Sequence, residues 1–196
     1  MNLGITGNIG TGKSTVLTRL KQIGFKIYDL DIIAKSTYKK GLPAYLEIIS
    51  KYDNILDSHD EIDTKILSKI VFNSKPHLDI LQNIVWPHVR NYILEILKSN
   101  NNKNVFEGAL IIKADWHKLL DHVWIIDSDF EIVKKRLLKH RNINEKGYLN
   151  ILNNQQVIDQ MTRILKKDKI PYSIILNNTN KNDLIKIVDN KINKIN

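Results

Sequence analysis

The sequence predicts a single α/β domain built around a parallel sheet, and the order of its first elements supports this fold class. Residues 2–6 form a short apolar run that ends in a glycine-rich turn, and residues 13–23 then place apolar side chains at helical spacing. A second strand at 25–28 and a helix at 31–39 complete a strand–helix–strand unit, which is typical of open parallel sheets. With 196 residues, the chain is long enough for one large core and too short for two full domains.

The later part of the chain continues this alternation after a helical interruption. Residues 41–100 are mostly helical in pattern, so we expect a helical insertion beside the sheet. Apolar runs follow at 105–106 and 109–112. The remaining expected elements are a strand at 123–127, a basic helix at 131–141, a short strand at 174–176 and a closing amphipathic helix at 183–195.

Composition excludes several classes of protein. The chain is 42% hydrophobic and 26% charged, which is typical of a globular protein, and its apolar runs are shorter than the roughly 20 residues of a membrane-spanning helix. The N-terminus lacks a secretory pattern, so we expect a cytoplasmic protein. The absence of cysteine excludes disulfides and thiolate chemistry, and the six histidines show no convincing metal-ligand spacing.

The formal net charge of +9 suggests a nucleic-acid partner, because clustered cations release phosphate counterions on binding. However, lysine supplies most of the 30 cations, and Ile, Asn and Lys are abundant along the whole chain, as A/T-rich codons would produce. We therefore favour a basic surface without such a partner. A positive field could still attract a small polyanionic substrate.

Residues 7–15, with the sequence GNIGTGKST, match the phosphate-binding pattern G-x4-G-K-[ST] in every fixed position. The segment lies between an expected strand and an expected helix, which is the context that the motif requires. Its glycines let backbone N–H groups curl around phosphate oxygens, and the helix directs its positive end at the same place. We predict that Lys13 reaches the terminal phosphates, that Ser14 coordinates the magnesium of the nucleotide and that Thr15 helps to hold phosphate.

Switches, motors and small-molecule kinases all use such a loop, so other features must indicate the reaction. The chain is short for a motor, and the segment 177–180 lacks the acid of a guanine-reading motif, which favours a small-molecule kinase. A carboxylate at the end of the second strand would lie near the phosphates. From spacing alone, Asp29 and Asp31 could each act on an attacking hydroxyl or cap the following helix.

Taken together, these segments resemble the dephospho-CoA kinase family. GITGNIGTGKST at residues 4–15 is similar to the family's GLTGGIGSGKST, and DLDIIAK at 29–35 is similar to its DADxIAR. Gly41, the segment 67–72 and the order of the later elements also follow the family's sequence. The resemblance implies a P-loop NTPase three-layer α/β fold with a parallel central sheet, a helical substrate-binding insertion at about 41–100 and a lid at about 134–160.

The resemblance also implies a reaction, in which the γ-phosphate of ATP passes to the ribose 3′-hydroxyl of dephospho-CoA in the last step of coenzyme A synthesis, with Mg2+. At matching positions, Asp31 would be the catalytic carboxylate, while Lys13, Arg136 and Arg141 would surround the transferring phosphoryl group. Asn177 and its neighbours would border the adenine. The residues expected to bind the ATP phosphates are Gly10, Thr11, Gly12, Lys13, Ser14 and Thr15.

Some positions depart from the family pattern. Trp86 replaces a family histidine, and Lys113 stands where the family often has glutamate, with Glu107 nearby but not at the matching place. In the lid, either His140 or Arg141 matches the family's arginine, depending on a single gap.

We expect ATP and dephospho-CoA as small-molecule substrates, with neither nucleic acid nor a membrane as partner. A monomer is one oligomeric state that the sequence allows. One alternative is another nucleoside, nucleotide or metabolite kinase, which would share the loop and the lid but not the acceptor. A second is a nucleotide-dependent nucleic-acid-binding protein, suggested by the +9 charge.

Overall fold

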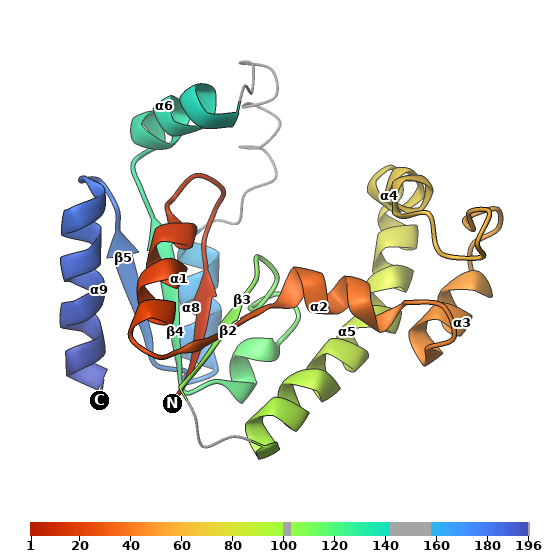
Figure 1. Cartoon of the computed structure of the whole chain (residues 1–196), viewed down its shortest axis with the longest axis horizontal. Helices are drawn as coiled ribbons and strands as arrows, with labels where there is room; N and C mark the ends of the chain where they lie inside the picture. The colour runs from red at the N-terminus through yellow and green to blue at the C-terminus, as the bar shows by residue number, and fades with distance from the viewer. Residues whose placement is uncertain (100–102, 142–157, 196) are drawn as a thin grey trace. The chain divides into compact units, whose positions relative to one another are not determined.

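The computed structural model describes residues 1–99, 103–141 and 158–195 (Figure 1). Contacts divide the chain into two compact units, of which the first consists of Met1–Tyr28 and Asn101–Asn196 and the second of Asp29–Asn100. The second unit therefore begins earlier than the expected start of the helical insertion near residue 41.

The first unit contains a five-stranded sheet with the strand order β2-β3-β1-β4-β5. Strand β1 pairs in parallel with β3 and β4, and β4 pairs in parallel with β5, which confirms the predicted fold class. The carboxyl end of the central strand β1 therefore lies between the carboxyl ends of β3 and β4, where ligands of such sheets bind. The strands are β1 (Asn2–Thr6), β2 (Lys26–Asp29), β3 (Asn104–Glu107), β4 (His122–Asp127) and β5 (Tyr172–Leu176).

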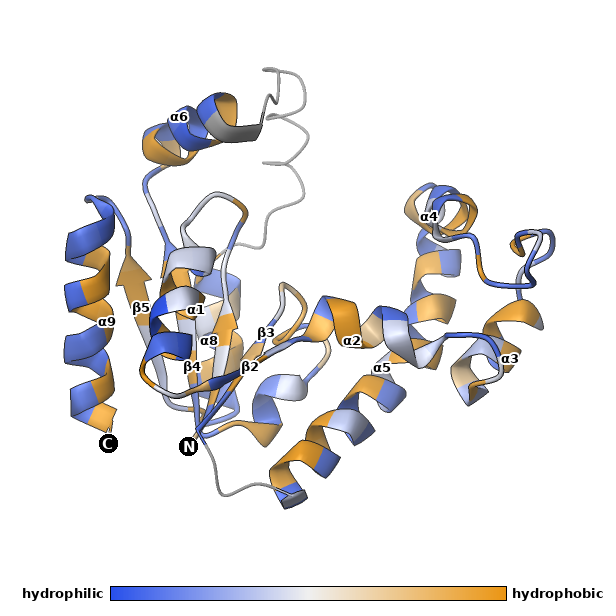
Figure 2. Cartoon of the chain, in the orientation of Figure 1, coloured by the Kyte–Doolittle hydropathy of each residue, from blue (hydrophilic) through white to orange (hydrophobic). Residues whose placement is uncertain are grey.

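Helices cover both faces of this sheet because alternate side chains of its strands point to opposite sides. On β4, Trp124 and Ile126 join the apolar cluster that includes helices α1 (Lys13–Gln22) and α9 (Lys181–Ile195). The intervening Val123 and Ile125 pack instead against α8 (Ile158–Lys167). Figure 2 shows apolar and polar residues alternating along α9, as expected for a helix with one face on a sheet.

The second unit is helical and contains α2 (Leu30–Thr37), α3 (Pro43–Ile49), α4 (Thr64–Phe72) and the long α5 (Lys75–Ser99). Helix α5 contacts each of the other three. The fully buried side chains of Ile48, Ile55, Val89 and Ile93 belong to this unit. Among the described residues of this unit, strand-like pairing is limited to a single antiparallel bridge between Leu56 and Ile62. The helical pattern of 41–100 is therefore confirmed.

Several boundaries differ from the sequence-based expectations. The apolar run at 109–112 is a turn that leads into the short helix η1 (Trp116–Leu119), since its carbonyl oxygens accept hydrogen bonds from the following residues 114–117. Ile111 and Ile112 are buried in this turn. Helix α8 was not expected at all. The basic helix is present as α6 (Phe130–Arg141), whereas 142–157 of the expected lid lie outside the described residues. Within the described ranges, no helix has both the length and the apolar composition to cross a membrane.

Candidate functional site

The phosphate-binding motif forms the loop between β1 and α1, and its glycines are required by its backbone. Gly7, Gly10 and Gly12 all have positive φ, at 139°, 80° and 98°. A Cβ atom on Gly7 would collide with the carbonyl oxygen of Ile126, and one on Gly12 would collide with the side-chain amide of Asn177. The loop is therefore pressed against β4 on one side and against the β5–α9 connection on the other, which only glycine permits.

Helix α1 starts directly after Gly12, which occupies the N-cap position in a left-handed conformation. No side chain caps this terminus by a hydrogen bond, and the first turn of the helix carries no acidic residue. No carboxylate in the first turn of α1 therefore neutralises the positive end of the helix dipole, which faces the loop. Such a terminus favours a phosphate group.

Lys13 places its ammonium group on the inner side of the loop. Its Nζ donates hydrogen bonds to the carbonyl oxygens of Gly7, at 2.8 Å, and Asn8, at 3.1 Å. The cation is thus held beside the backbone that would surround phosphate oxygens, where its charge complements theirs.

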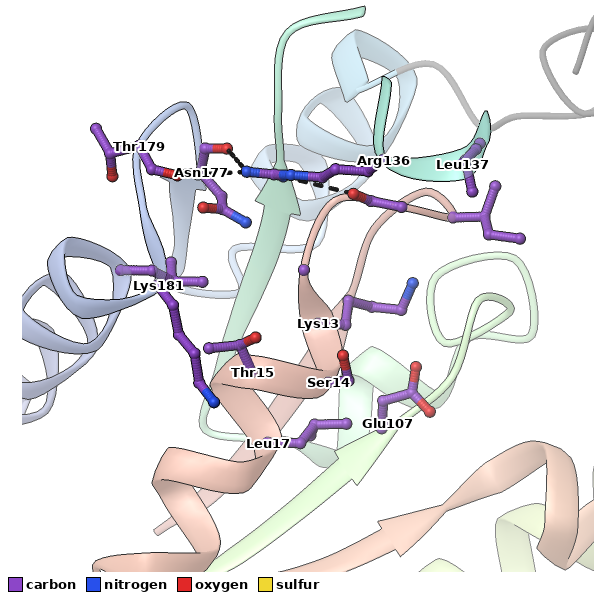
Figure 3. A pocket seen from close by; sticks show the side chains of 14 residues that line it. Lys13, Ser14, Thr15, Leu17, Glu107, Arg136, Leu137, Asn177, Thr179 and Lys181 are labelled. Atoms are coloured by element: carbon purple, nitrogen blue, oxygen red, sulfur yellow. Dashed lines mark hydrogen bonds between the residues drawn. The ribbon is translucent and has the colours of Figure 1, made fainter. Parts of the chain in front are cut away.

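A cavity of about 720 Å³ opens around this loop (Figure 3). This volume is in the range of sites for small molecules. Three cationic residues, Lys13, Arg136 and Lys181, line it together with one carboxylate, Glu107. Its walls come from the loop, α1, β3, α6, the β5–α9 connection and the start of α9. The complete lining is Ile9, Gly10, Gly12, Lys13, Ser14, Thr15, Leu17, Glu107, Arg136, Leu137, Asn177, Thr179, Lys181 and Leu184.

Arg136 joins three of these walls through its guanidinium group (Figure 3). It donates to the carbonyl oxygens of Asn177 at 3.0 Å, Thr179 at 3.4 Å and Gly10 at 3.5 Å, and to the hydroxyl of Ser128 at 3.3 Å. A planar group with five N–H donors can satisfy such a set of acceptors, which a lysine cannot. Arg136 therefore fixes the phosphate loop relative to α6 and the β5–α9 connection.

Asn177 supplies a second tie between the same segments. Its side chain is buried, and its Nδ2 donates to the carbonyl oxygen of Thr11 at 2.8 Å. Its backbone N–H donates to the carbonyl oxygen of Asp127 at 2.8 Å. Thr11 itself is 1% exposed, and its hydroxyl donates to the carbonyl oxygen of Asn8 within the loop. Thr11 is thus the one residue of the expected segment 10–15 that does not line the cavity.

The two aspartates that the sequence left equivalent differ in the structure. Asp29 occupies the N-cap of α2, and its Oδ1 accepts hydrogen bonds from the backbone N–H groups of Asp31 at 2.9 Å and Ile32 at 3.0 Å. Asp29 is therefore the capping residue. Asp31 lies exposed in the first turn of the same helix, in the second unit, and its catalytic role stays a prediction.

The lid residues are described only in part. Helix α6 ends at Arg141, but the side chains of His140 and Arg141 lie outside the described residues, so the choice between them stays open. Lys113 is exposed in the turn before η1 and does not line the cavity. Sequence reasoning did not assign Glu107 or Lys181 to the site, because neither belongs to a local motif. The available signal was that Glu107 directly follows the apolar residues Val105 and Phe106, as an acid at the end of a strand would.

A second group of polar side chains lies apart from the cavity, where η1 meets the end of α8. Asp115, His117 and Asp168 bring one ligand atom each within 4.8 Å of one another. His117 is fully buried, and its Nε2 lies 2.8 Å from Oδ2 of Asp168. The Nζ of Lys118 lies 2.9 Å from Asp115 and 3.7 Å from Asp168, so a cation of the chain already compensates both carboxylates. We interpret this group as an ion-pair network.

Comparisons with known proteins agree with this geometry. The family model for dephospho-CoA kinase matches residues 1–183. A dephospho-CoA kinase from Fusobacterium nucleatum is 36% identical over 191 residues, which cover 96% of this chain and 95% of the relative. The structure of a dephospho-CoA kinase from Campylobacter jejuni has a TM-score of 0.69 and 28% identity, and the match covers 99% of this chain and 96% of the other.

A protein of known structure from Thermus thermophilus shares the fold, with a TM-score of 0.79 at 22% identity over 100% of this chain and 98% of the other. The family match spans the phosphate loop, the helical unit and the strands that form the cavity. The chain belongs to the dephospho-CoA kinase family.

Proposed function

We propose that this chain transfers the γ-phosphate of ATP to the ribose 3′-hydroxyl of dephospho-CoA. The observation that supports this proposal most directly is a complete phosphate loop that lines a cation-rich cavity in a chain of this family. The names of its relatives supply the acceptor, and the loop supplies the reason for a phosphoryl donor.

In the proposed mechanism, the backbone N–H groups of the loop and the N-terminus of α1 bind the β- and γ-phosphates of ATP. Lys13 would move its ammonium group from the carbonyl oxygens of Gly7 and Asn8 to the phosphate oxygens. Ser14 lines the same cavity, and its hydroxyl is a suitable oxygen ligand for Mg2+, which would neutralise charge on the phosphates.

Asp31 is the proposed base for the acceptor. Its carboxylate would take the proton of the 3′-hydroxyl while the oxygen of that hydroxyl bonds to the γ-phosphorus. The bond between this phosphorus and the bridging oxygen breaks, and ADP leaves with the electron pair. The capping role of Asp29 supports this assignment because Asp31 is then not needed to start α2.

Arg136 and Arg141 are proposed to act at the other end of the reacting groups. Arg136 holds the loop and the β5–α9 connection together around the nucleotide, while Arg141 would close over the transferring phosphoryl group from the lid. Closure would also exclude water, so that ATP is not hydrolysed before the acceptor binds.

Purified chain, ATP, Mg2+ and a panel of acceptors test the function. We expect a phosphorylated product, identified by mass spectrometry, with dephospho-CoA and far less with adenosine, AMP or shikimate. The Lys13→Ala variant serves as the inactive control. Equal rates with all acceptors would indicate another small-molecule kinase. Salt-sensitive binding of DNA or RNA without transfer to any small acceptor would indicate a nucleic-acid-binding protein instead.

A further inference from the structure

Lys181 has no role in the mechanism described so far, although it is one of the three cations among the described residues that line the cavity. The chain itself engages the other two, because Lys13 donates to the carbonyl oxygens of the loop and Arg136 donates to the acceptors named above. Lys181 is exposed, and no acid within the described ranges forms an ion pair with it. Its ammonium group is therefore available to a ligand of the cavity.

Lys181 is the first residue of α9, so its cation lies at the positive end of the helix dipole. The helix is capped without it, because Oδ1 of Asn180 accepts hydrogen bonds from the backbone N–H groups of Asn182 at 2.9 Å and Asp183 at 3.1 Å. The acid of the first turn, Asp183, accepts a hydrogen bond from Asn180 at 2.7 Å and lies 3.8 Å from Lys186. A cation at this position opposes the dipole, and an anion that approaches from the cavity would compensate both.

Two contacts of α9 with α1 determine the direction in which Lys181 points. Leu184, three residues later, is buried in the apolar cluster that also contains residues of α1. Asp189, eight residues later, pairs with Arg19 of α1 through two hydrogen bonds of 2.7 and 3.0 Å. Because a helix has about 3.6 residues per turn, Lys181 lies between these two rows, on the side of α9 that faces α1. Figure 3 shows its side chain extending from the start of α9 toward Thr15.

Thr15 and Lys181 line the part of the cavity that follows the residues assigned to the terminal phosphates. Lys13 and Ser14 are assigned to the β- and γ-phosphates and their magnesium, and Thr15 is the next residue along α1. A nucleotide bound in this way would extend its α-phosphate toward the wall that Thr15 and Lys181 form. An ammonium group has three donors and a positive charge, which match the oxygens of a phosphate.

We propose that Lys181 binds the α-phosphate of the nucleotide, while Lys13 binds the terminal phosphates. This inference rests on the nucleotide site of the proposed function. It gives the three cations of the cavity different tasks, because Arg136 holds the surrounding segments together. The α-phosphate keeps its charge throughout the transfer, so Lys181 would bind ATP and ADP alike and contribute to affinity.

The test compares the Kd values of a non-hydrolysable ATP analogue, ADP, AMP and adenosine for wild type and Lys181→Gln at about 0.15 M salt. Calorimetry measures the analogue and ADP, and competition against the analogue measures AMP and adenosine, so that all four ligands report the same site. We expect the variant to bind the three nucleotides roughly 5- to 20-fold more weakly than wild type, because each carries an α-phosphate. Its Kd for adenosine should equal that of wild type.

The matched control is Lys186→Gln, which removes the same charge from an exposed position of α9 that does not line the cavity and should keep all four wild-type Kd values. Lys181→Arg keeps the charge and should recover part of the affinity. Without nucleotide, thermal unfolding of Lys181→Gln should occur at or above the wild-type temperature, because the substitution removes a cation from the positive end of α9. A loss of affinity then does not arise from a loss of stability.

A loss confined to the ATP analogue and ADP would place Lys181 at the terminal phosphates and overturn the assignment. A loss that extends to adenosine would place it at the sugar or the base, with the same consequence, and unchanged Kd values would remove its role altogether.

Turnover of dephospho-CoA by wild type tests the proposed function separately. Such turnover together with wild-type affinities in Lys181→Gln removes only the role of Lys181. Absence of turnover together with an equal loss for the three nucleotides removes only the acceptor and supports the contact with the α-phosphate.

Discussion

Asp29 and Asp31 are separated by one residue, and their hydrogen bonds give them different tasks. The carboxylate of Asp29 accepts hydrogen bonds from two backbone N–H groups of α2, and an alanine side chain has no acceptor that could replace it. Asp31 is exposed in the same turn and is not the cap. Substitutions at these two positions can therefore separate helix stability from catalysis.

We expect Asp31→Asn to lower kcat by roughly 10²- to 10⁴-fold, because an amide cannot accept the proton of the hydroxyl. Its Kd for the ATP analogue should stay within a few fold of wild type. We expect Asp29→Ala to lower the free energy of unfolding by about 1 kcal/mol instead, through loss of the cap. Steady-state kinetics, calorimetry and urea unfolding measure these quantities. Normal turnover in Asp31→Asn would leave that residue without a catalytic role.

The phosphate loop depends on the elements packed against it as much as on its own glycines. Its tip residue Ile9 contacts the apolar pair Val133 and Leu137 of α6, while Gly12 leaves room for the side chain of Asn177. Gly24, after the end of α1, has a φ of 93°, close to the 98° of Gly12, but no atom lies within 4 Å of the position of its Cβ. An L-residue with a side chain would therefore meet similar backbone strain at both positions, but only at Gly12 would its Cβ be crowded.

Substitution of each glycine by alanine should separate these effects. Gly24→Ala should lower the free energy of unfolding by roughly 1 to 2 kcal/mol and leave the Kd for nucleotide unchanged. Gly12→Ala should carry the same strain and also displace Asn177, which breaks its hydrogen bond to Thr11 and weakens nucleotide binding. Thermal unfolding and calorimetry compare the two variants. Equal nucleotide affinities in both would contradict the role of the β5–α9 connection.

Arg136 connects α6 to the loop and to the β5–α9 connection, so its substitution tests how these elements are held together. We expect Arg136→Lys to lower the free energy of unfolding by roughly 1 to 2 kcal/mol, because a single ammonium group cannot replace the fork of donors to Gly10 and Asn177. Nucleotide affinity should fall with it. The control is Lys135→Ala at the neighbouring exposed position, which should stay within about 0.5 kcal/mol of wild type.

The stability of the whole fold should depend on pH through the network at η1 and α8. The hydrogen bond from His117 is the main cause that lowers the pKa of Asp168, and the charge of Lys118 adds to it. Because the pKa of Asp168 is lower in the folded chain than in the unfolded chain, its contribution is present above the unfolded value of about 3.9. It is lost as the pH falls through the lower folded value.

We therefore expect Asp168→Asn to lower the midpoint of urea unfolding at pH 7 and to have a smaller effect near pH 3, where protonation of this carboxyl in the unfolded chain has already removed part of its contribution. The control is Asp159→Asn, which alters an exposed acid on α8. Asp121→Asn is unsuitable as a control because Asp121 accepts a hydrogen bond from the backbone N–H of Asn2. An equal loss of stability at both pH values would show that the charge of Asp168 is not what stabilises the junction.

Local patterns in the amino-acid sequence were sufficient for the α/β class and for most of the phosphate site. The chemistry of the loop depends on neighbouring residues, so the spacing of its glycines, Lys13 and Ser14 carries the prediction. The helical character of 41–100 was predictable for the same reason, because apolar residues that recur every three to four positions indicate a helix. Patterns of this kind did not distinguish Asp29 from Asp31, because both positions suit a helix start.

The remaining parts of the site depend on the pairing of strands that lie far apart in the sequence. Strand β3 follows a helical unit of about 70 residues before it pairs with β1, and no local pattern encodes which strands become neighbours. Glu107 thereby reaches the face of α1, and Arg136 reaches carbonyl groups of Gly10 and Asn177 that lie far from it in the sequence. These contacts exist only after the sheet has formed, because strand order and side-chain alternation set which distant residues share one cavity.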